Sequence, residues 1–184
     1  MKTADIHYST DVSQESRKTA ELNFVRQQGF EDASPEACVH QYPALMLQPR
    51  VTGILILIGL VLQAWPYFLA LSALLWWNVA LPKLNPFDAI YNHFVAKPKG
   101  LPRLGPAQNP RRFGAQVIAG TFLFVIALSL FSGWNALAWG LEAVMVVALA
   151  AVIFGRFCLG SYIYLLLTGH AGFANRTLPW AHSK

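Results

Sequence analysis

Two long apolar runs limit what this chain can fold into. No charged side chain occurs in residues 51–81, and this run is too long for one straight membrane-spanning helix, which needs about twenty residues. Residues 63–67 (Gln-Ala-Trp-Pro-Tyr) interrupt the run with a proline and two aromatic side chains, so two helices joined by a tight turn are expected. Hydrophobic residues make up 55% of the chain and charged residues 12%, which excludes a disordered chain and an ordinary soluble enzyme. The sequence therefore predicts an integral membrane protein.

The second half of the chain repeats this pattern. An uncharged span is expected over residues 113–131, followed by a tight turn at residues 132–135 and a further apolar run over residues 136–168. The last run exceeds the thickness of the bilayer at 1.5 Å per residue, so it must tilt, project from the membrane, or bend near Gly155 or Gly160. The fold class predicted is an all-α membrane protein with four transmembrane helices arranged as two helical hairpins.

Three segments are predicted around this membrane domain. Residues 1–48 are expected to form a polar N-terminal tail with short helices, residues 49–168 the four-helix domain, and residues 169–184 a short polar C-terminal tail. In the N-terminal tail, Ser34 before Pro35 is a helix start signal, and Pro43 and Pro49 are expected to interrupt the approach to the membrane. Helices this short and weakly amphipathic are not stable alone, so the tail is expected to be either a flexible cytoplasmic segment or one that docks a partner.

The orientation follows from the charges. Residues 82–112 hold six basic side chains against Asp88 alone and lie between the two apolar halves, where the positive-inside rule places cytoplasmic loops. We therefore predict a multi-pass protein of the bacterial cytoplasmic (inner) membrane with both termini in the cytoplasm. A basic loop beside a membrane also predicts contact with anionic lipids, and it explains the positive charge without a nucleic-acid partner.

A short helix lying in the membrane interface is predicted at residues 86–95. Asn85 can cap it, Pro86 suits its first position, and Asp88 lies in its first turn. Phe87, Ile90, Tyr91 and Phe94 would share one face, as expected for an interfacial helix. Lipid contact is therefore predicted for this helix and the loop after it, through Asn85, Pro86, Phe87, Asp88, Lys97 and Lys99.

Cys158 admits two interpretations. Ala148, Ala151, Gly155 and Cys158 have the spacing i, i+3, i+7 and i+10, which on one helix would form a stripe of small residues for close helix packing. Cys158 and Ser161 also have the C-x-x-S spacing of a thiol motif that lacks its resolving cysteine. Along a continuous apolar helix desolvation favours the neutral thiol, so packing is preferred and Cys158 is only a weak catalytic candidate.

Glu142 and Arg156 are charged residues inside the last apolar run. Such residues are functional candidates by default, but Glu142 can reach the far interface and Arg156 can extend to the near one. About 21 Å of helix separates them, so they cannot pair with each other, and Asp88 is the expected partner of Arg156. Too few charged groups lie at mid-membrane to predict a proton or ion pathway.

No metal or cofactor site is predicted. All five histidines lie outside the central spans, whereas a haem between membrane helices needs axial ligands from those helices, and Met145 is the one candidate there. Cys38 and Cys158 have neither a C-x-x-C partner nor metal-ligand spacing. Phosphate-binding, metalloprotease and serine-hydrolase motifs are also missing from the sequence.

Three short motifs nevertheless occur in a specific order: Asn85-Pro86-Phe87-Asp88 with Tyr91-Asn92, then residues 109–113 (Asn-Pro-Arg-Arg-Phe), then Phe157-Cys158 with Ser161 and Tyr164. Over about residues 49–168 this order resembles the bacterial membrane-protein family catalogued as domain of unknown function 4395. The resemblance implies a small four-span protein and supplies no established activity. Some members are associated with sulfur-handling or redox contexts, which gives Cys158 added interest.

The favoured hypothesis is a non-catalytic accessory or assembly subunit of a larger bacterial membrane complex, with other membrane subunits as partners. It rests on the lack of a catalytic constellation, the small-residue stripe, and two tails suited to docking. A membrane thiol-redox or sulfur-transfer protein that uses Cys158 is the first alternative. A small-solute permease is the second, and it is limited by the small number of polar residues in the spans.

Overall fold

The computed structural model describes residues 2–181, and the regular structure in that range is helical throughout. Three segments are long and apolar enough to cross a membrane: Pro35–Leu62, Pro110–Phe131 and Asn135–Ile153. The helices are α1 (Lys2–Gln27), α2 (Pro35–Leu62), α3 (Trp65–Ala80), η1 (Pro82–Leu84), α4 (Pro86–Tyr91), η2 (Asn92–Ala96), η3 (Pro110–Gln116), α5 (Val117–Phe131), α6 (Asn135–Ile153), α7 (Leu159–Leu167) and α8 (Ala171–Arg176). The structure therefore confirms an all-helical fold with three segments that could span a membrane.

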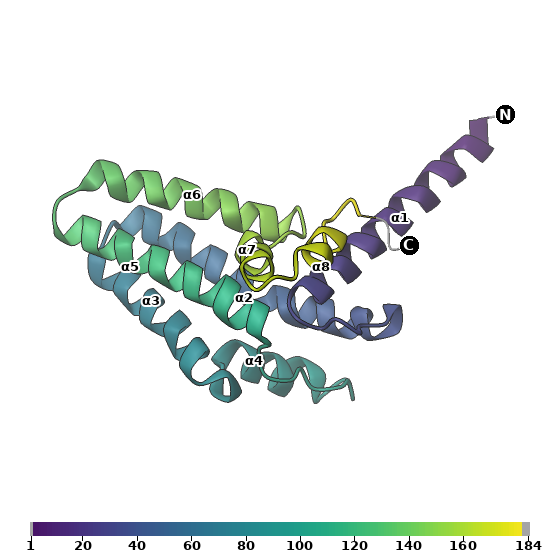
Figure 1. Cartoon of the computed structure of the whole chain (residues 1–184), viewed down its shortest axis with the longest axis horizontal. Helices are drawn as coiled ribbons and strands as arrows, with labels where there is room; N and C mark the ends of the chain where they lie inside the picture. The colour runs from purple at the N-terminus through teal and green to yellow at the C-terminus, as the bar shows by residue number, and fades with distance from the viewer. Residues whose placement is uncertain (1, 182–184) are drawn as a thin grey trace.

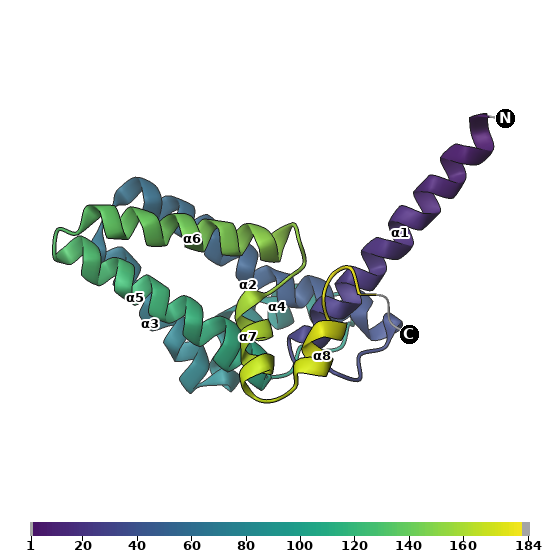
Figure 2. The same ribbon diagram turned by 45° about the horizontal axis from the view of Figure 1, so that its top comes forward.

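The two tight turns lie where the sequence places them. α2 ends at Leu62, Gln63 adopts a left-handed conformation (φ 47°), and α3 starts at Trp65. α5 ends at Phe131 and α6 starts at Asn135. Both turns lie at one end of the molecule, and both chain termini lie toward the other (Figures 1 and 2).

The helices do not pair simply with their neighbours in sequence. α3 packs mainly against α5, whereas α6 packs against both α5 and α2. The core between them is formed by large apolar side chains, among them Ile56, Phe68, Leu123, Ile126 and Met145. α3 has 16 residues and falls short of the roughly twenty that a perpendicular span needs.

α2 runs across the expected boundary between the tail and the membrane domain. Ser34 caps the helix as predicted, because its hydroxyl accepts a hydrogen bond from the Ala37 N–H at 3.2 Å. The helix then continues through Pro43 and Pro49 to Leu62. Prolines are tolerated within helices where neighbouring helices or side chains satisfy the freed carbonyl groups. The division at residue 48 therefore falls inside a single helix.

The predicted helix at residues 86–95 is present as α4 and its wider continuation η2, and Asn85 caps it by accepting the Phe87 N–H at 3.0 Å. Its predicted lipid face is wrong in part. Asn85, Phe87 and Asp88 are buried against protein, and so is Tyr91, whose hydroxyl donates to the His40 carbonyl. Burial raises the pKa of the Tyr91 phenol, which keeps this donor protonated. The exposed side chains are instead Ile90, Phe94, Lys97 and Lys99, with Pro86 half-buried.

The last apolar run is broken in the middle. α6 ends at Ile153, Arg156 has a left-handed backbone (φ 52°), and α7 begins at Leu159. Ala148 and Ala151 therefore lie on α6, Gly155 lies in the break, and Cys158 caps α7. A stripe of these four residues requires one continuous helix, so the structure does not contain the predicted packing face.

Candidate functional site

The structure places Cys158 at the start of a helix. Cys158 is the N-cap residue of α7, with extended backbone angles (φ −101°, ψ 100°). Cys158 therefore does not lie inside a continuous apolar helix, which was the premise of the argument against a chemical role. Its side chain is buried, at 6% exposed, in an apolar cluster.

Two polar contacts hold the Cys158 backbone and thiol. The Cys158 N–H donates to the Oε1 of Gln27 at 2.8 Å. The Ser161 hydroxyl lies 3.4 Å from the Cys158 sulfur and 3.1 Å from the Pro110 carbonyl oxygen, so its hydrogen can be directed to either. Gln28 donates from Nε2 to the same hydroxyl oxygen at 3.3 Å. The C-x-x-S pair is thus a single hydrogen-bonded unit, and α1 supplies part of it.

Cys158 lines a cavity of about 260 Å³ whose wall is formed by residues of α1, α2, α3, η3, α5, α6 and α7. Most of its wall is apolar, including Leu45, Leu75, Phe122 and Met145. Its polar lining residues besides Cys158 are Gln28, Gln48, Thr52, Arg111 and Gln116. Two buried polar atoms of these residues, Thr52 Oγ1 and Gln116 Oε1, have no hydrogen-bond partner within the described chain. Mainly apolar pockets with a few polar groups are typical of small-molecule sites.

A buried ion pair between Arg111 and Asp88 lies beside this cavity, and Arg111 is one of its lining residues. The Arg111 guanidinium donates to both carboxylate oxygens of Asp88, at 2.7 Å and 3.1 Å. It also donates to the Oε1 of Gln48 at 2.8 Å, and that oxygen accepts a second bond from Gln116 at 3.1 Å. Arg111 is 3% exposed and Asp88 7%. Paired in this two-point geometry, the two charges compensate each other, so the cavity presents no free charge from this cluster.

The expected partner of Arg156 is therefore wrong, because Asp88 is occupied by Arg111. Arg156 instead lies 3.5 Å from the carboxylate of Glu21 on α1. Neither the Asp88–Arg111 pair nor the Glu21–Arg156 pair can be read from the sequence, because each joins residues from different segments of the chain.

Glu142 is fully buried on α6 and contacts the turn between α2 and α3. Gln63, the residue of that turn, donates from Nε2 to both Glu142 carboxylate oxygens, at 3.0 and 3.3 Å. This contact ties the turn to α6. It is remote from the Cys158 cavity, whose lining includes neither residue.

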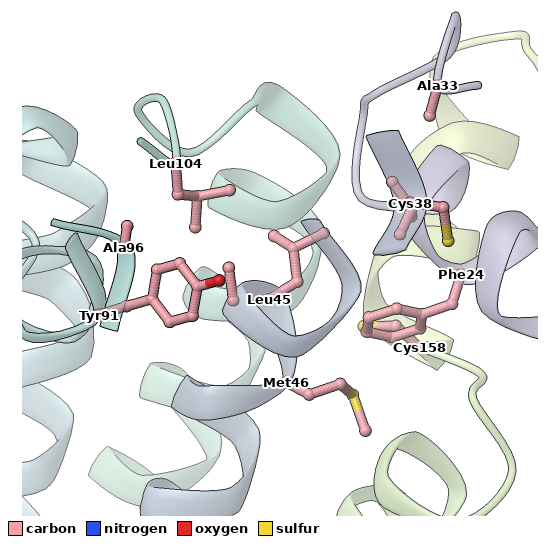
Figure 3. Close-up of a cluster of buried hydrophobic side chains, with 11 residues drawn as sticks. Phe24, Ala33, Cys38, Leu45, Met46, Tyr91, Ala96, Leu104 and Cys158 are labelled. Carbon is pink, nitrogen blue, oxygen red and sulfur yellow. The ribbon is translucent and has the colours of Figure 1, made fainter. Parts of the chain in front are cut away.

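Cys38 lies in the same buried apolar cluster as Cys158, and both are next to Phe24 (Figure 3). Cys38 is a free thiol on α2. It is not among the residues that line the cavity. Groups of three or more histidine, cysteine or acidic residues that could hold a metal do not occur within the described range.

Sequence reasoning missed two glycines that bring Cys158 to its place. Gly114 in η3 and Gly160 in α7 meet backbone to backbone: a Cβ atom on Gly114 would lie 2.6 Å from the Gly160 carbonyl oxygen and 2.8 Å from the Ser161 Cα. This contact is the close helix approach that small residues permit. The available signal was Gly160 two residues after Cys158, although the sequence suggested Gly155 instead.

The helices and the cavity define a class, that of helical membrane-type proteins with an internal, mainly apolar pocket. The family model described as Domain of unknown function (DUF4395) matches residues 44–168. The chain therefore belongs to this family, as the sequence motifs suggested. Comparison with curated proteins and with solved structures found no match.

Proposed function

We propose that this chain is a membrane thiol protein in which Cys158 exchanges disulfide bonds with a small molecule or peptide that enters the cavity. The observation that carries the proposal is the position of Cys158 at the N-terminus of α7, with the Ser161 hydroxyl 3.4 Å from its sulfur and a mainly apolar cavity beside it.

The chemistry needs one thiolate and a disulfide-bearing substrate. The Cys158 sulfur attacks one substrate sulfur, a Cys158–substrate disulfide forms, and the other substrate sulfur leaves as a thiolate that takes up a proton. A second thiol, supplied by the substrate or by another molecule, then attacks the mixed disulfide and restores Cys158. The Ser161 hydroxyl can donate a hydrogen bond to the Cys158 sulfur while it carries negative charge.

The test is the reaction of the folded, full-length chain in mild detergent with 4,4′-dithiodipyridine, a small uncharged disulfide. We expect Cys158 to react first, at a rate at least about tenfold above that of Cys38, because Cys158 lines a cavity that a small disulfide can enter and Cys38 does not. Release of thiopyridone measures the rate, and mass spectrometry identifies the modified residue.

Matched variants make the result specific. Cys158→Ser should abolish the fast phase, while Cys38→Ser should leave it unchanged. If both thiols react only after denaturation, at similar rates, Cys158 is a buried packing residue and the proposal is wrong.

A second proposal concerns the membrane setting. The chain is proposed to cross a bacterial inner membrane four times, with α3 as the crossing in addition to the three candidate spans, and both termini in the cytoplasm. The exposed apolar side chains Ile90 and Phe94 and the exposed Lys97, Lys99 and Arg103 support contact with an anionic lipid surface on the side of the termini.

An accessory role in a larger complex is compatible with this setting and is favoured by α1. The first half of α1 projects from the helical body in both views (Figures 1 and 2). Its described side chains from Gln14 to Lys18 are exposed. A projecting helix of this kind can dock another membrane subunit without chemistry of its own.

One pair of matched substitutions tests topology and docking together. In a chain without its native cysteines, Ser16→Cys on α1 and Ser132→Cys at the α5–α6 turn replace exposed serines with nearly isosteric thiols. A membrane-impermeant maleimide should label position 132 in intact cells and position 16 only in inverted vesicles. Labelling of position 16 in intact cells would overturn the topology. Equal labelling rates at position 16 in vesicles and in the purified chain would overturn docking through α1.

A further inference from the structure

We propose that α1 is part of the Cys158 site and that Gln27 is the residue that positions Cys158. This inference rests on the proposed thiol function for its chemical consequence, but the positioning itself is a structural claim. Gln27 and the rest of α1 precede the segment matched by the family model, which begins at residue 44. The chain therefore completes its site with a helix that lies outside the family-matched domain.

The argument starts from the backbone of Cys158. An N-cap residue has an N–H group without a partner inside its own helix. In a capping box, the side chain three residues later accepts this N–H, and in α7 that residue is Ser161. The Ser161 hydroxyl instead contacts the Pro110 carbonyl and the Cys158 sulfur. Gln27 on α1 takes over the acceptor role, with its Oε1 2.8 Å from the Cys158 nitrogen.

The contact with Cys158 is the one hydrogen bond that the Gln27 side chain makes among the described residues. Its side chain is fully buried (0% exposed), and its Nε2 has no hydrogen-bond partner among the described residues. A glutamine buried with one half of its amide unsatisfied is costly. Its one hydrogen bond is the bond to Cys158, which identifies the positioning of this residue as the role of the side chain.

Further contacts of α1 and of the residue after it fix the register of this contact on both sides of Cys158. Glu21 pairs with Arg156 in the α6–α7 break at 3.5 Å, and Gln28, directly after α1, donates to Ser161 at 3.3 Å. Asn23 donates from Nδ2 to the carbonyl oxygens of Leu178 and Ala181, both at 2.9 Å. Because α1 is held before, at and after Cys158, its placement determines where the thiol points.

α1 also forms a wall of the cavity. Phe24 and Gln28 both line it, and Phe24 lies next to Cys158 in the buried cluster (Figure 3). A substrate that reaches the sulfur therefore meets side chains of α1.

The experiment uses the full-length chain with ¹⁵N-labelled cysteine, which yields amide signals from Cys38 and Cys158 only. Gln27→Met keeps the length of the side chain but removes the acceptor, and we expect the hydrogen-exchange rate of the Cys158 amide to rise about tenfold or more. Cys38, whose N–H bonds to the Ser34 carbonyl, is the internal reference. Gln27→Glu, which retains an acceptor oxygen, should restore the protection, and Gln14→Met on the exposed part of α1 is the control.

Unchanged exchange at Cys158 in Gln27→Met would overturn the inference. An equal rise at both cysteines would also overturn it, because Gln27 would then stabilise the fold generally. In the disulfide assay, Gln27→Met should slow the Cys158 reaction about fivefold or more, since the thiol is no longer held against the α7 N-terminus. If the unmodified chain does not react at Cys158 at all, the proposed function fails and the exchange result alone decides whether Gln27 positions this residue.

Discussion

Replacing Arg111 with alanine is expected to lower the free energy of unfolding by about 3–5 kcal/mol, because it leaves the buried Asp88 carboxylate without its compensating charge. Gln48 and Gln116 would lose a partner in the same step. Arg111→Lys should recover only part of the loss, since an ammonium group cannot bond both Asp88 oxygens and Gln48 in the same planar geometry. The measurement is denaturant unfolding of the full chain in mixed micelles.

The control for this effect is Arg103→Ala, which removes an exposed arginine from the same loop region and should change stability by less than about 0.5 kcal/mol. The double variant Arg111→Met with Asp88→Leu removes both charges together. It should be far less destabilising than the sum of the single changes, because no buried charge is left unpaired. Additive losses in the double variant would contradict the pairing as the source of stability.

Replacing Gly160 with leucine is expected to destabilise the chain by about 3 kcal/mol or more, because the side chain has no space between α7 and η3. A Cβ atom at this position would lie 3.0 Å from the Gly114 carbonyl carbon and 3.2 Å from the Ala115 Cα. These are backbone atoms, so the two helices would have to move apart. Thermal unfolding followed by circular dichroism in detergent measures the loss.

Gly140→Leu provides the matched control on α6, where a Cβ atom meets no atom within 4 Å. This change should be neutral or slightly stabilising, because leucine has the higher helix propensity. Gly160→Leu should also disturb the position of Cys158, which lies two residues earlier. A Gly160→Leu chain as stable as the Gly140→Leu chain would show that the close contact between α7 and η3 does not exist in solution.

Features that depend on local chemistry could be predicted from the sequence. The Ser34 and Asn85 caps, the helix starting at Pro86 and the turns near residues 63 and 133 are all set by residues a few positions apart. Proline, glycine and capping side chains act over this range, so a single sequence carries the signal. The motifs also identified the family correctly.

Features that depend on tertiary contacts could be predicted only in part or not at all. A bend near Gly155 was one of three expected ways to fit the last apolar run, and the break after Ile153 occurs there. Its form, with Arg156 and Cys158 in contact with Glu21 and Gln27 of α1, depends on tertiary contacts. The pairing of Asp88 with Arg111 instead of Arg156 likewise depends on how η3 packs beside α4. Small residues do allow a close helix contact in this chain, but the contact joins Gly114 and Gly160 and does not involve the predicted Gly155. Spacing along one helix does not reveal which helix faces it.

The contact between Gln27 and Cys158 also constrains how the chain is made. Its two residues are 131 positions apart, and ribosomes add roughly 5–20 residues per second. Gln27 is therefore synthesised on the order of ten seconds before the backbone N–H of Cys158 exists to donate to it. During that interval α1 can already pack against α2, where Phe24 meets Tyr42, but the Gln27 side chain lacks its hydrogen-bond partner. A chain that stops before Cys158 leaves this amide without that partner permanently.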